Sequence, residues 1–162
     1  MARTYDKDAK HMGEVFKRAH QHKGTSFVEI YQNCVIFNDA VFEPTIGKDV
    51  KADNVVFLKQ GEPLVYGKES QKAITLDGFT PRVTDNPAEA IVHNEQEAAS
   101  SYGYMLSQLN NPEFPQPMGV FRDVEKPAYE DEMQRQEDEI TAKLGEGDLE
   151  SLLKSGDTWE IT

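Results

Sequence analysis

The chain has 162 residues, enough for one domain with a core, and its 38% apolar residues and 11 glycines are typical of globular proteins. Its 29 acidic and 17 basic residues give a net charge of −12, which disfavours nonspecific nucleic-acid binding, because polyphosphates attract dense Lys and Arg. No apolar run reaches the roughly 18 residues that a spanning helix needs, and residues 1–10 are too polar for a signal peptide. We therefore expect a soluble cytoplasmic protein that binds neither nucleic acid nor membrane.

The N-terminal part is predicted to form one αβ unit. Residues 6–22 carry apolar side chains at helical spacing, with Asp6 or Asp8 as the cap and Gly24 as a natural stop. The predicted apolar face consists of Met12, Val15, Phe16 and Ala19. Residues 26–37 are rich in β-formers, which predicts a largely buried strand. Such a strand needs neighbouring strands and covering helices, and the sequence offers no second similar unit, which indicates a missing N-terminal part.

The middle of the chain changes to short β-segments. The predicted strands are residues 55–58, 64–66, 74–76 and 79–83. Residues 60–63 and the Asp77-Gly78 pair have the composition of hairpin turns. We therefore expect a small antiparallel β-region.

The C-terminal part is predicted to be mostly helical. Residues 95–109 are expected to form a helix that ends at Asn110-Asn111-Pro112. The prolines of residues 112–117 predict an extended segment held by aromatic contacts and not by ladder hydrogen bonds. An acidic helix over residues 127–144 and a short helix from Asp148 follow.

The predicted fold is thus an α/β fragment, followed by a small β-region and a helical acidic C-terminal extension. We divide it into residues 1–43, the αβ unit; residues 44–125, short strands plus one helix; and residues 126–162, the acidic helical tail.

Most candidate site residues have a plain structural interpretation. The four histidines are His11, His20, His22 and His93. His20 and His22 are two positions apart, so they point to different helix faces and are expected to be exposed, while His93 stays unassigned. The acidic side chains of residues 130–139 could bind a metal or a partner, although a solvated face is the simpler interpretation. Residues 145–148 lack the Lys of a phosphate loop and are expected to be a hinge or helix cap. No Gly-x-Ser-x-Gly sequence supports hydrolase chemistry.

Cys34 is the single cysteine, so it can form no intrachain disulfide and no four-cysteine metal site by itself. Its chemistry alone favours a buried thiol at the end of a strand. The end of a parallel strand is also where open α/β sheets bind ligands, and a thiolate there could bind a metal with help from other residues. Spacing leaves both interpretations open.

Several segments resemble the thiamine-diphosphate-binding β subunit of 2-oxoacid:ferredoxin oxidoreductases, most closely the 2-oxoglutarate type. The most specific are residues 22–39, which include Glu29-Ile30-Tyr31-Gln32-Asn33-Cys34, and residues 111–122, which include Pro112-Glu113-Phe114-Pro115. The other matching segments are residues 51–54, 61–64 and 145–159. Together they resemble the C-terminal half of that subunit, and residues 1–43 would then end its thiamine-diphosphate-binding domain.

The resemblance implies one site residue and several absent ones. A cysteine in the position of Cys34 is the last of four ligands to a 4Fe-4S cluster in this family. The other three cysteines, and the Gly-Asp-Gly type segment whose Asn holds magnesium and diphosphate, lie in an N-terminal half that this sequence does not contain. We therefore assign no catalytic or thiamine-binding residue here, and expect a fragment, or a reading frame started late, that is inactive alone. A subunit split over two chains is the alternative.

For the complete enzyme, the resemblance implies oxidative decarboxylation of a 2-oxoacid to acyl-CoA, with electrons passed to ferredoxin. The implied cofactors are thiamine diphosphate, magnesium and the 4Fe-4S cluster. The implied partners are the α subunit, the missing N-terminal half, ferredoxin, the 2-oxoacid and coenzyme A. A noncatalytic acidic adaptor or assembly module is the competing function, and a fragment with an aggregation-prone edge at residues 26–37 is the third interpretation.

Overall fold

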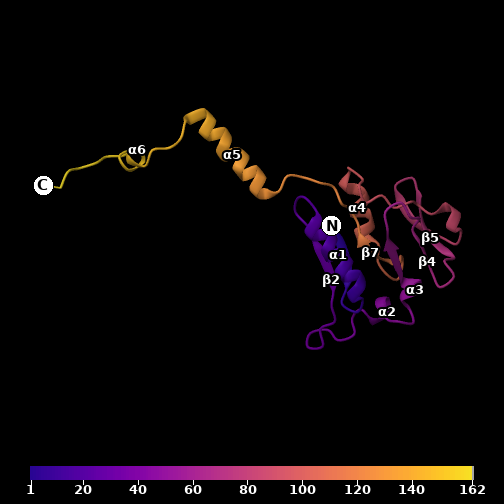
Figure 1. Cartoon of the computed structure of the whole chain (residues 1–162). Coiled ribbons are helices and arrows are strands. Elements are labelled where there is room, and N and C mark those ends of the chain that lie inside the picture. The colour runs from indigo at the N-terminus through magenta and orange to yellow at the C-terminus, as the bar shows by residue number, and fades with distance from the viewer. Residues whose placement is uncertain (162) are drawn as a thin grey trace. The chain divides into compact units, whose positions relative to one another are not determined.

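A computed structural model describes residues 1–161, which fall into two compact units. The larger unit comprises Met1–His22 and Ser26–Glu125, and the smaller one comprises Lys23–Thr25 and Lys126–Thr162. Figure 1 shows both units and labels helices and strands of each where there is room.

A four-stranded sheet with the order β2-β1-β7-β3 organises the larger unit. β1 (Ala2–Tyr5) pairs in parallel with β2 (Val28–Tyr31), and α1 (Ala9–Gln21) connects them. β3 (Val55–Leu58) pairs in parallel with β7 (Gln116–Val120), and β7 pairs antiparallel with β1. The predicted helix and its Asp8 cap are confirmed, because the Asp8 carboxylate accepts a hydrogen bond from the His11 backbone N–H.

β7 corrects the prediction for the proline-rich segment. Residues 116–120 are all buried and lie between β1 and β3, so the prediction of an extended segment without ladder hydrogen bonds is wrong for this part. The strand depends on Gly119, which has φ of +127°. A Cβ added there would lie 2.6 Å from the Leu58 carbonyl oxygen, so the close approach of β3 requires glycine.

A second sheet contains three antiparallel strands in the order β4-β5-β6. These are β4 (Val65–Tyr66), β5 (Lys72–Asp77) and β6 (Thr80–Thr84), and Gly78, with φ of +61°, makes the predicted hairpin turn. The antiparallel β-region is thus confirmed for three of its four strands. The fourth, β3, belongs to the first sheet, so residues 60–63 form a turn between two sheets and not a hairpin.

Short helices complete the larger unit: α2 (Glu43–Ile46), α3 (Lys51–Asn54), η1 (Pro87–Glu89) and α4 (Ser100–Gln108). α4 confirms the predicted helix but begins five residues later, because the Glu95 side chain pairs with Arg18 and the Glu95 backbone N–H donates to Gln60. The main core packs α4 against β3, β4 and β5. It contains Val56, Leu58, Leu64, Tyr66, Ile74, Leu106, Leu109 and Phe121.

Smaller core clusters lie on the four-stranded sheet. Val15 of α1 packs on Ala2 and Val120, which fastens α1 to β1 and β7. Residues 1–43 and 44–125 therefore contribute strands to the same sheet, and β1 and β7, which lie on opposite sides of the predicted boundary, pair directly. A mixed α/β chain is confirmed, while the assignment of residues 1–43 to a thiamine-diphosphate domain stays a prediction.

The smaller unit contains the two helices predicted near the C-terminus. α5 (Tyr129–Leu144) carries Glu130, Asp131 and Glu132 in its first turn, and α6 (Leu149–Leu153) begins at an Asp148 cap. All side chains of both helices are exposed, as a solvated acidic face requires, and Gly145 caps α5 as expected. Within residues 1–161, no helix has the length and apolar character that crossing a membrane requires.

Candidate functional site

Cys34 lies in a loop at the carboxyl end of β2, the position expected of a ligand site on parallel strands. Asn33 closes this loop, because its backbone N–H donates to Asp6 Oδ2 (3.0 Å) and its side chain hydrogen-bonds both Asp39 Oδ1 (2.9 Å) and the Ala40 N–H (2.8 Å). Asp6 itself follows the carboxyl end of β1. In Figure 1 the loop extends beyond the end of β2. The ends of two adjacent parallel strands therefore fix the loop that presents Cys34.

The Cys34 thiol is exposed, so the interpretation as a buried thiol is wrong. Backbone N–H groups, first that of Phe37 and then those of Ile36 and Asn38, hydrogen-bond the sulfur and lower the pKa of the thiol. The loop is held in this shape by a bond from the Asn38 N–H to the Cys34 carbonyl (2.9 Å). Because the thiolate is the form that binds metals, the loop favours the metal-binding state of Cys34.

The three residues after Cys34 correct the predicted strand. Val35, Ile36 and Phe37 are 73, 83 and 89% exposed, although an apolar run of this kind predicts a buried strand. β2 ends at Tyr31 because the chain turns there, and Phe42 returns to stack on Tyr31 with ring centroids 4.3 Å apart. Among the described residues nothing covers the apolar run, so Cys34 is bordered by an open apolar surface.

A polar cluster lies beneath the carboxyl end of β1. The buried Tyr5 hydroxyl donates to Asp8 Oδ2 (3.0 Å) and accepts from Lys51 Nζ (3.1 Å), and burial raises its pKa. The His11 N–H lowers the pKa of the Asp8 carboxylate, while burial lowers the pKa of His11, whose Nδ1 hydrogen-bonds Thr4 Oγ1 (2.8 Å). These contacts fix the turn from β1 into α1, which holds Asp6 under the Cys34 loop.

One Asp6 oxygen stands out in this turn. Oδ2 accepts from Asn33, whereas Oδ1 is buried and has no hydrogen-bond partner. Within residues 1–161 no group of three or more His, Cys, Asp or Glu side chains lies close enough to hold a metal ion. Cys34 can therefore supply one thiolate, and its role as a cluster ligand stays a prediction.

His20, His22 and His93 lie in three different environments. His20 is exposed, as expected. His22 is not, because its side chain is 14% exposed and Nδ1 lies 2.7 Å from Asp123 Oδ1. His93 is fully buried: Nε2–H donates to the Val120 carbonyl (2.8 Å), and Nδ1 hydrogen-bonds the Tyr102 hydroxyl (3.1 Å). Burial lowers the pKa of His93, which keeps it neutral as a core residue.

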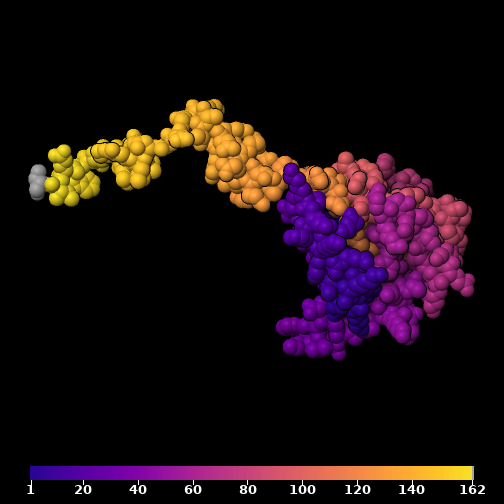
Figure 2. Space-filling model, viewed as in Figure 1, coloured from indigo at the N-terminus to yellow at the C-terminus, as the bar shows by residue number. Residues whose placement is uncertain are grey.

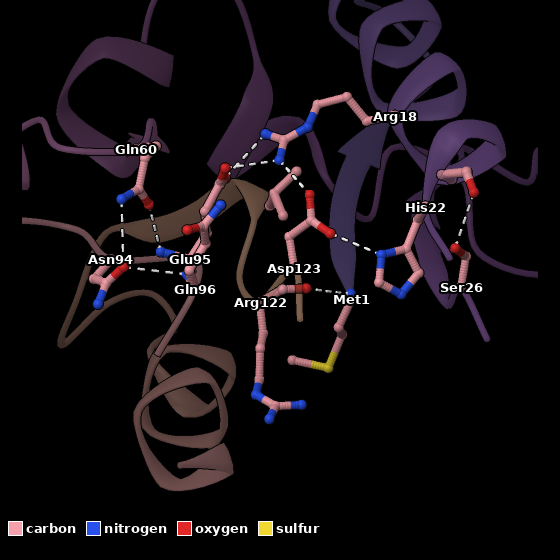
Figure 3. A network of polar contacts seen from close by, with 12 residues as sticks. Met1, Arg18, His22, Ser26, Gln60, Asn94, Glu95, Gln96, Arg122 and Asp123 are labelled. Carbon is pink, nitrogen blue, oxygen red and sulfur yellow. Dashed lines mark hydrogen bonds and ion pairs between the residues drawn. The ribbon is translucent and has the colours of Figure 1, made fainter. Parts of the chain in front are cut away.

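An ion-pair network that the sequence did not predict surrounds Arg18 of α1 (Figure 3). The guanidinium binds both oxygens of the buried Glu95, at 2.9 and 2.7 Å, and also Asp123 Oδ2 at 2.6 Å. Burial opposes the ionisation of Asp123, but hydrogen bonds from Arg18 and His22 outweigh it and lower its pKa. The partners are 77 and 105 residues apart in sequence, so no local pattern could have indicated the network. Its role is to bind α1 to the segments around Glu95 and Asp123.

Comparison with known proteins finds a relative that aligns with almost the whole chain. The chain is 32% identical to the 2-oxoglutarate oxidoreductase subunit KorB of Mycobacterium tuberculosis over 168 aligned residues, which cover 99% of this chain and 45% of the relative. The chain therefore spans about half the length of that relative. No protein-family model matches the chain, and no solved structure does. The resemblance stated from the sequence is confirmed: over almost its whole length, this chain is similar to a part of a KorB-type subunit of 2-oxoglutarate oxidoreductase.

Proposed function

We propose that the chain is part of the β subunit of a 2-oxoglutarate:ferredoxin oxidoreductase, which converts a 2-oxoacid to acyl-CoA and passes electrons to ferredoxin. The observation that carries this proposal is the similarity over 99% of the chain to a 2-oxoglutarate oxidoreductase subunit. Because the chain spans less than half of that relative, activity in this proposal requires the rest of a KorB-length subunit and an α subunit, and the chain alone is inactive.

In this proposal Cys34 supplies one ligand to a 4Fe-4S cluster. The residues present fit that role, because the thiol is exposed, has a lowered pKa and follows a parallel strand. One thiolate cannot hold such a cluster, so three further cysteines come from outside this chain. The cluster would supply one-electron transfer when bound. Thiamine diphosphate and magnesium would be bound outside this chain as well, and we assign none of its residues to them.

The other loop residues would position the ligand and exclude water. Asn33 and Asp6 fix the backbone on either side of the sulfur, and the N–H groups of residues 36–38 lower the pKa of the thiol, which favours the thiolate. The exposed Val35, Ile36 and Phe37 would be covered by the rest of the subunit. An apolar cover at this position would lower solvent access to a metal site, which is one way in which proteins tune it.

The test is assembly of this chain with the rest of a KorB-length subunit and its α subunit. We expect Cys34→Ser to lower the iron and sulfide content and the 2-oxoglutarate-dependent reduction of a dye. Gln32→Ala, which changes an exposed polar side chain two residues before Cys34, is the matched control and should leave both unchanged. Unchanged iron content in Cys34→Ser would exclude the ligand role.

A noncatalytic adaptor is the second candidate, because the smaller unit carries exposed apolar side chains that it does not bury. The same assembly separates the two functions. Dye reduction that depends on adding this chain supports the oxidoreductase. If adding this chain promotes assembly of the other chains, but the complex contains no iron and reduces no dye, the result supports the adaptor.

A further inference from the structure

α5 carries an apolar stripe of two residue pairs, one near each end of its 16 residues, with the polar Gln136 and Glu137 between them. Its members, Tyr129, Met133, Ile140 and Leu144, recur at intervals of four, seven and four residues, which at about 100° per residue places them within an arc of about 60°. The four side chains are 74, 41, 51 and 78% exposed. The helix is therefore amphipathic in pattern, but its stripe is not buried within the smaller unit.

The smaller unit does not explain this stripe. No residue of α5 or α6 is buried, and in Figure 2 the orange and yellow atoms of the two helices form separate groups joined by the chain between them. An isolated helix of this length is marginal in water, and tertiary packing of the apolar face normally stabilises it. A helix with this stripe is consequently expected to bury it against another surface.

The charge of α5 indicates the chemistry of the surface that would cover it. α5 contains six acidic side chains and two basic ones, and Arg135 is already paired with Glu132 (2.5 Å) and Glu139 (2.6 Å). Of the remaining carboxylates, Glu130 and Glu137 border the stripe on one side and have no ion-pair partner in the part of the chain that the structure describes. Asp131 and Asp138 lie on the opposite face, and the other cation of the helix is Lys143. A complementary partner therefore offers an apolar groove bordered by lysines and arginines.

Two other partners for the stripe, a second copy of α5 and a membrane surface, are disfavoured by charge. A second α5 would place one acidic helix beside another, and like charges across an interface disfavour binding. The anionic surface of a membrane repels the same carboxylates, whereas interfacial helices have basic polar faces.

We propose that α5 docks as an amphipathic helix into a basic-rimmed apolar groove on another subunit of the oxidoreductase complex. The identity of the partner rests on the proposed function, while the stripe and its charge are properties of this chain. α5 then serves as an assembly element, separate in role from Cys34.

The experiment compares two double variants in the assembled complex. Met133→Asp with Ile140→Asp places two charges on the stripe. Gln134→Asp with Thr141→Asp introduces the same residue at the same spacing, one position further along on the polar face. Binding of the purified α subunit is measured by calorimetry, with hydrogen exchange of the α5 amides as a second readout.

We expect the stripe variant to bind the α subunit at least about tenfold more weakly and the polar-face variant to bind within about twofold of wild type. Raising the salt concentration should weaken wild-type binding, and binding should protect the α5 amides from exchange. Equal affinity of the stripe variant and wild type, or binding that salt does not weaken, overturns the proposal. So does stripe-dependent self-association in sedimentation, or stripe-dependent binding to phosphatidylserine vesicles.

Iron content of the same samples distinguishes this proposal from the proposed function. A complex that contains iron and reduces dye while α5 stays unprotected refutes the docking alone. Stripe-dependent binding in a complex without iron refutes the role of Cys34 and leaves the docking intact.

Discussion

Substitution of Arg18 by alanine is expected to destabilise the larger unit strongly, because it removes the cation from a buried carboxylate. Glu95 has a side chain only 6% exposed, and both of its oxygens bind the Arg18 guanidinium. Asp123, at 29% exposure, loses a hydrogen bond in the same variant. Figure 3 shows that these contacts converge on one guanidinium, so a single substitution affects all of them.

The magnitude follows from burial. Removing one partner of a fully buried pair costs about 3–5 kcal/mol, because the other charge is left without compensation. Arg18 is itself 41% exposed, so solvent screening reduces this value, and we expect a loss of about 2–3 kcal/mol. The matched control is Arg82→Ala, which breaks a 2.7 Å pair with Asp77 whose side chains are 62 and 65% exposed. Such a surface pair should contribute less than about 1 kcal/mol.

The assay is urea unfolding followed by far-ultraviolet circular dichroism at pH 7. Adding Glu95→Gln to Arg18→Ala should recover part of the lost free energy, since the uncompensated charge is then removed. Equal losses in Arg18→Ala and Arg82→Ala, or no recovery in the double variant, would refute the reasoning. Either result would mean that Glu95 is not held by Arg18 in solution.

Two further predictions concern β7 and the buried histidine. Gly119→Ala should cost about 3 kcal/mol or more of unfolding free energy in the same assay, because φ is +127° and the new Cβ would meet the Leu58 carbonyl. The control is Gly13→Ala, which lies in open space on α1 and should stabilise the protein by roughly 0.5–1 kcal/mol. Equal effects of the two substitutions would contradict the register of β7. Burial lowers the pKa of His93 in the folded state below the unfolded value of about 6.5, so the unfolded state binds the proton first as the pH falls. The contribution of His93 to the free energy of unfolding is therefore fully present above about pH 6.5. Below that pH it falls by up to about 1.4 kcal/mol per pH unit. His93→Gln should make this slope shallower, with the remainder due to His11, and an unchanged slope between pH 5 and 7 would show that His93 is not the group involved.

The elements that the sequence predicted well have local signals. α1 has an aspartate cap and helical apolar spacing, and the Asp77-Gly78 turn places Gly78 at φ of +61°. α5 begins after a proline and ends at Gly145. In each case neighbouring residues determine the conformation, so no knowledge of distant contacts is needed.

The elements that the sequence missed depend on partners far along the chain. β1 is only four residues long and contains Arg3, whose side chain becomes buried by pairing with Glu29 and stacking over Phe121. β7 contains Pro117 and directly follows Pro115, and prolines argue against a strand, yet β1 and β3 provide partners on both sides. Local propensity was therefore outweighed by tertiary pairing.

Cys34 shows the same limit at the candidate site. The apolar run after it predicts burial, but burial requires a covering element, and the described residues contain none. Its backbone donors could not be foreseen either, since they arise from the tight loop that Asn33 closes. The residue was identifiable from its resemblance alone, whereas its exposure and lowered pKa needed the structure.

The two exposed apolar surfaces of this chain differ in chemistry, and that difference implies two kinds of contact. The run Val35–Phe37 contains no charge, so its burial would be driven by removal of apolar area from water and would be insensitive to salt. The α5 stripe is bordered by carboxylates, so its burial must also satisfy their charge and should weaken as salt screens it. The proposed assembly therefore requires that added salt releases α5 while the Cys34 loop stays covered. If one partner surface contacted both regions at once, salt would affect both of them together.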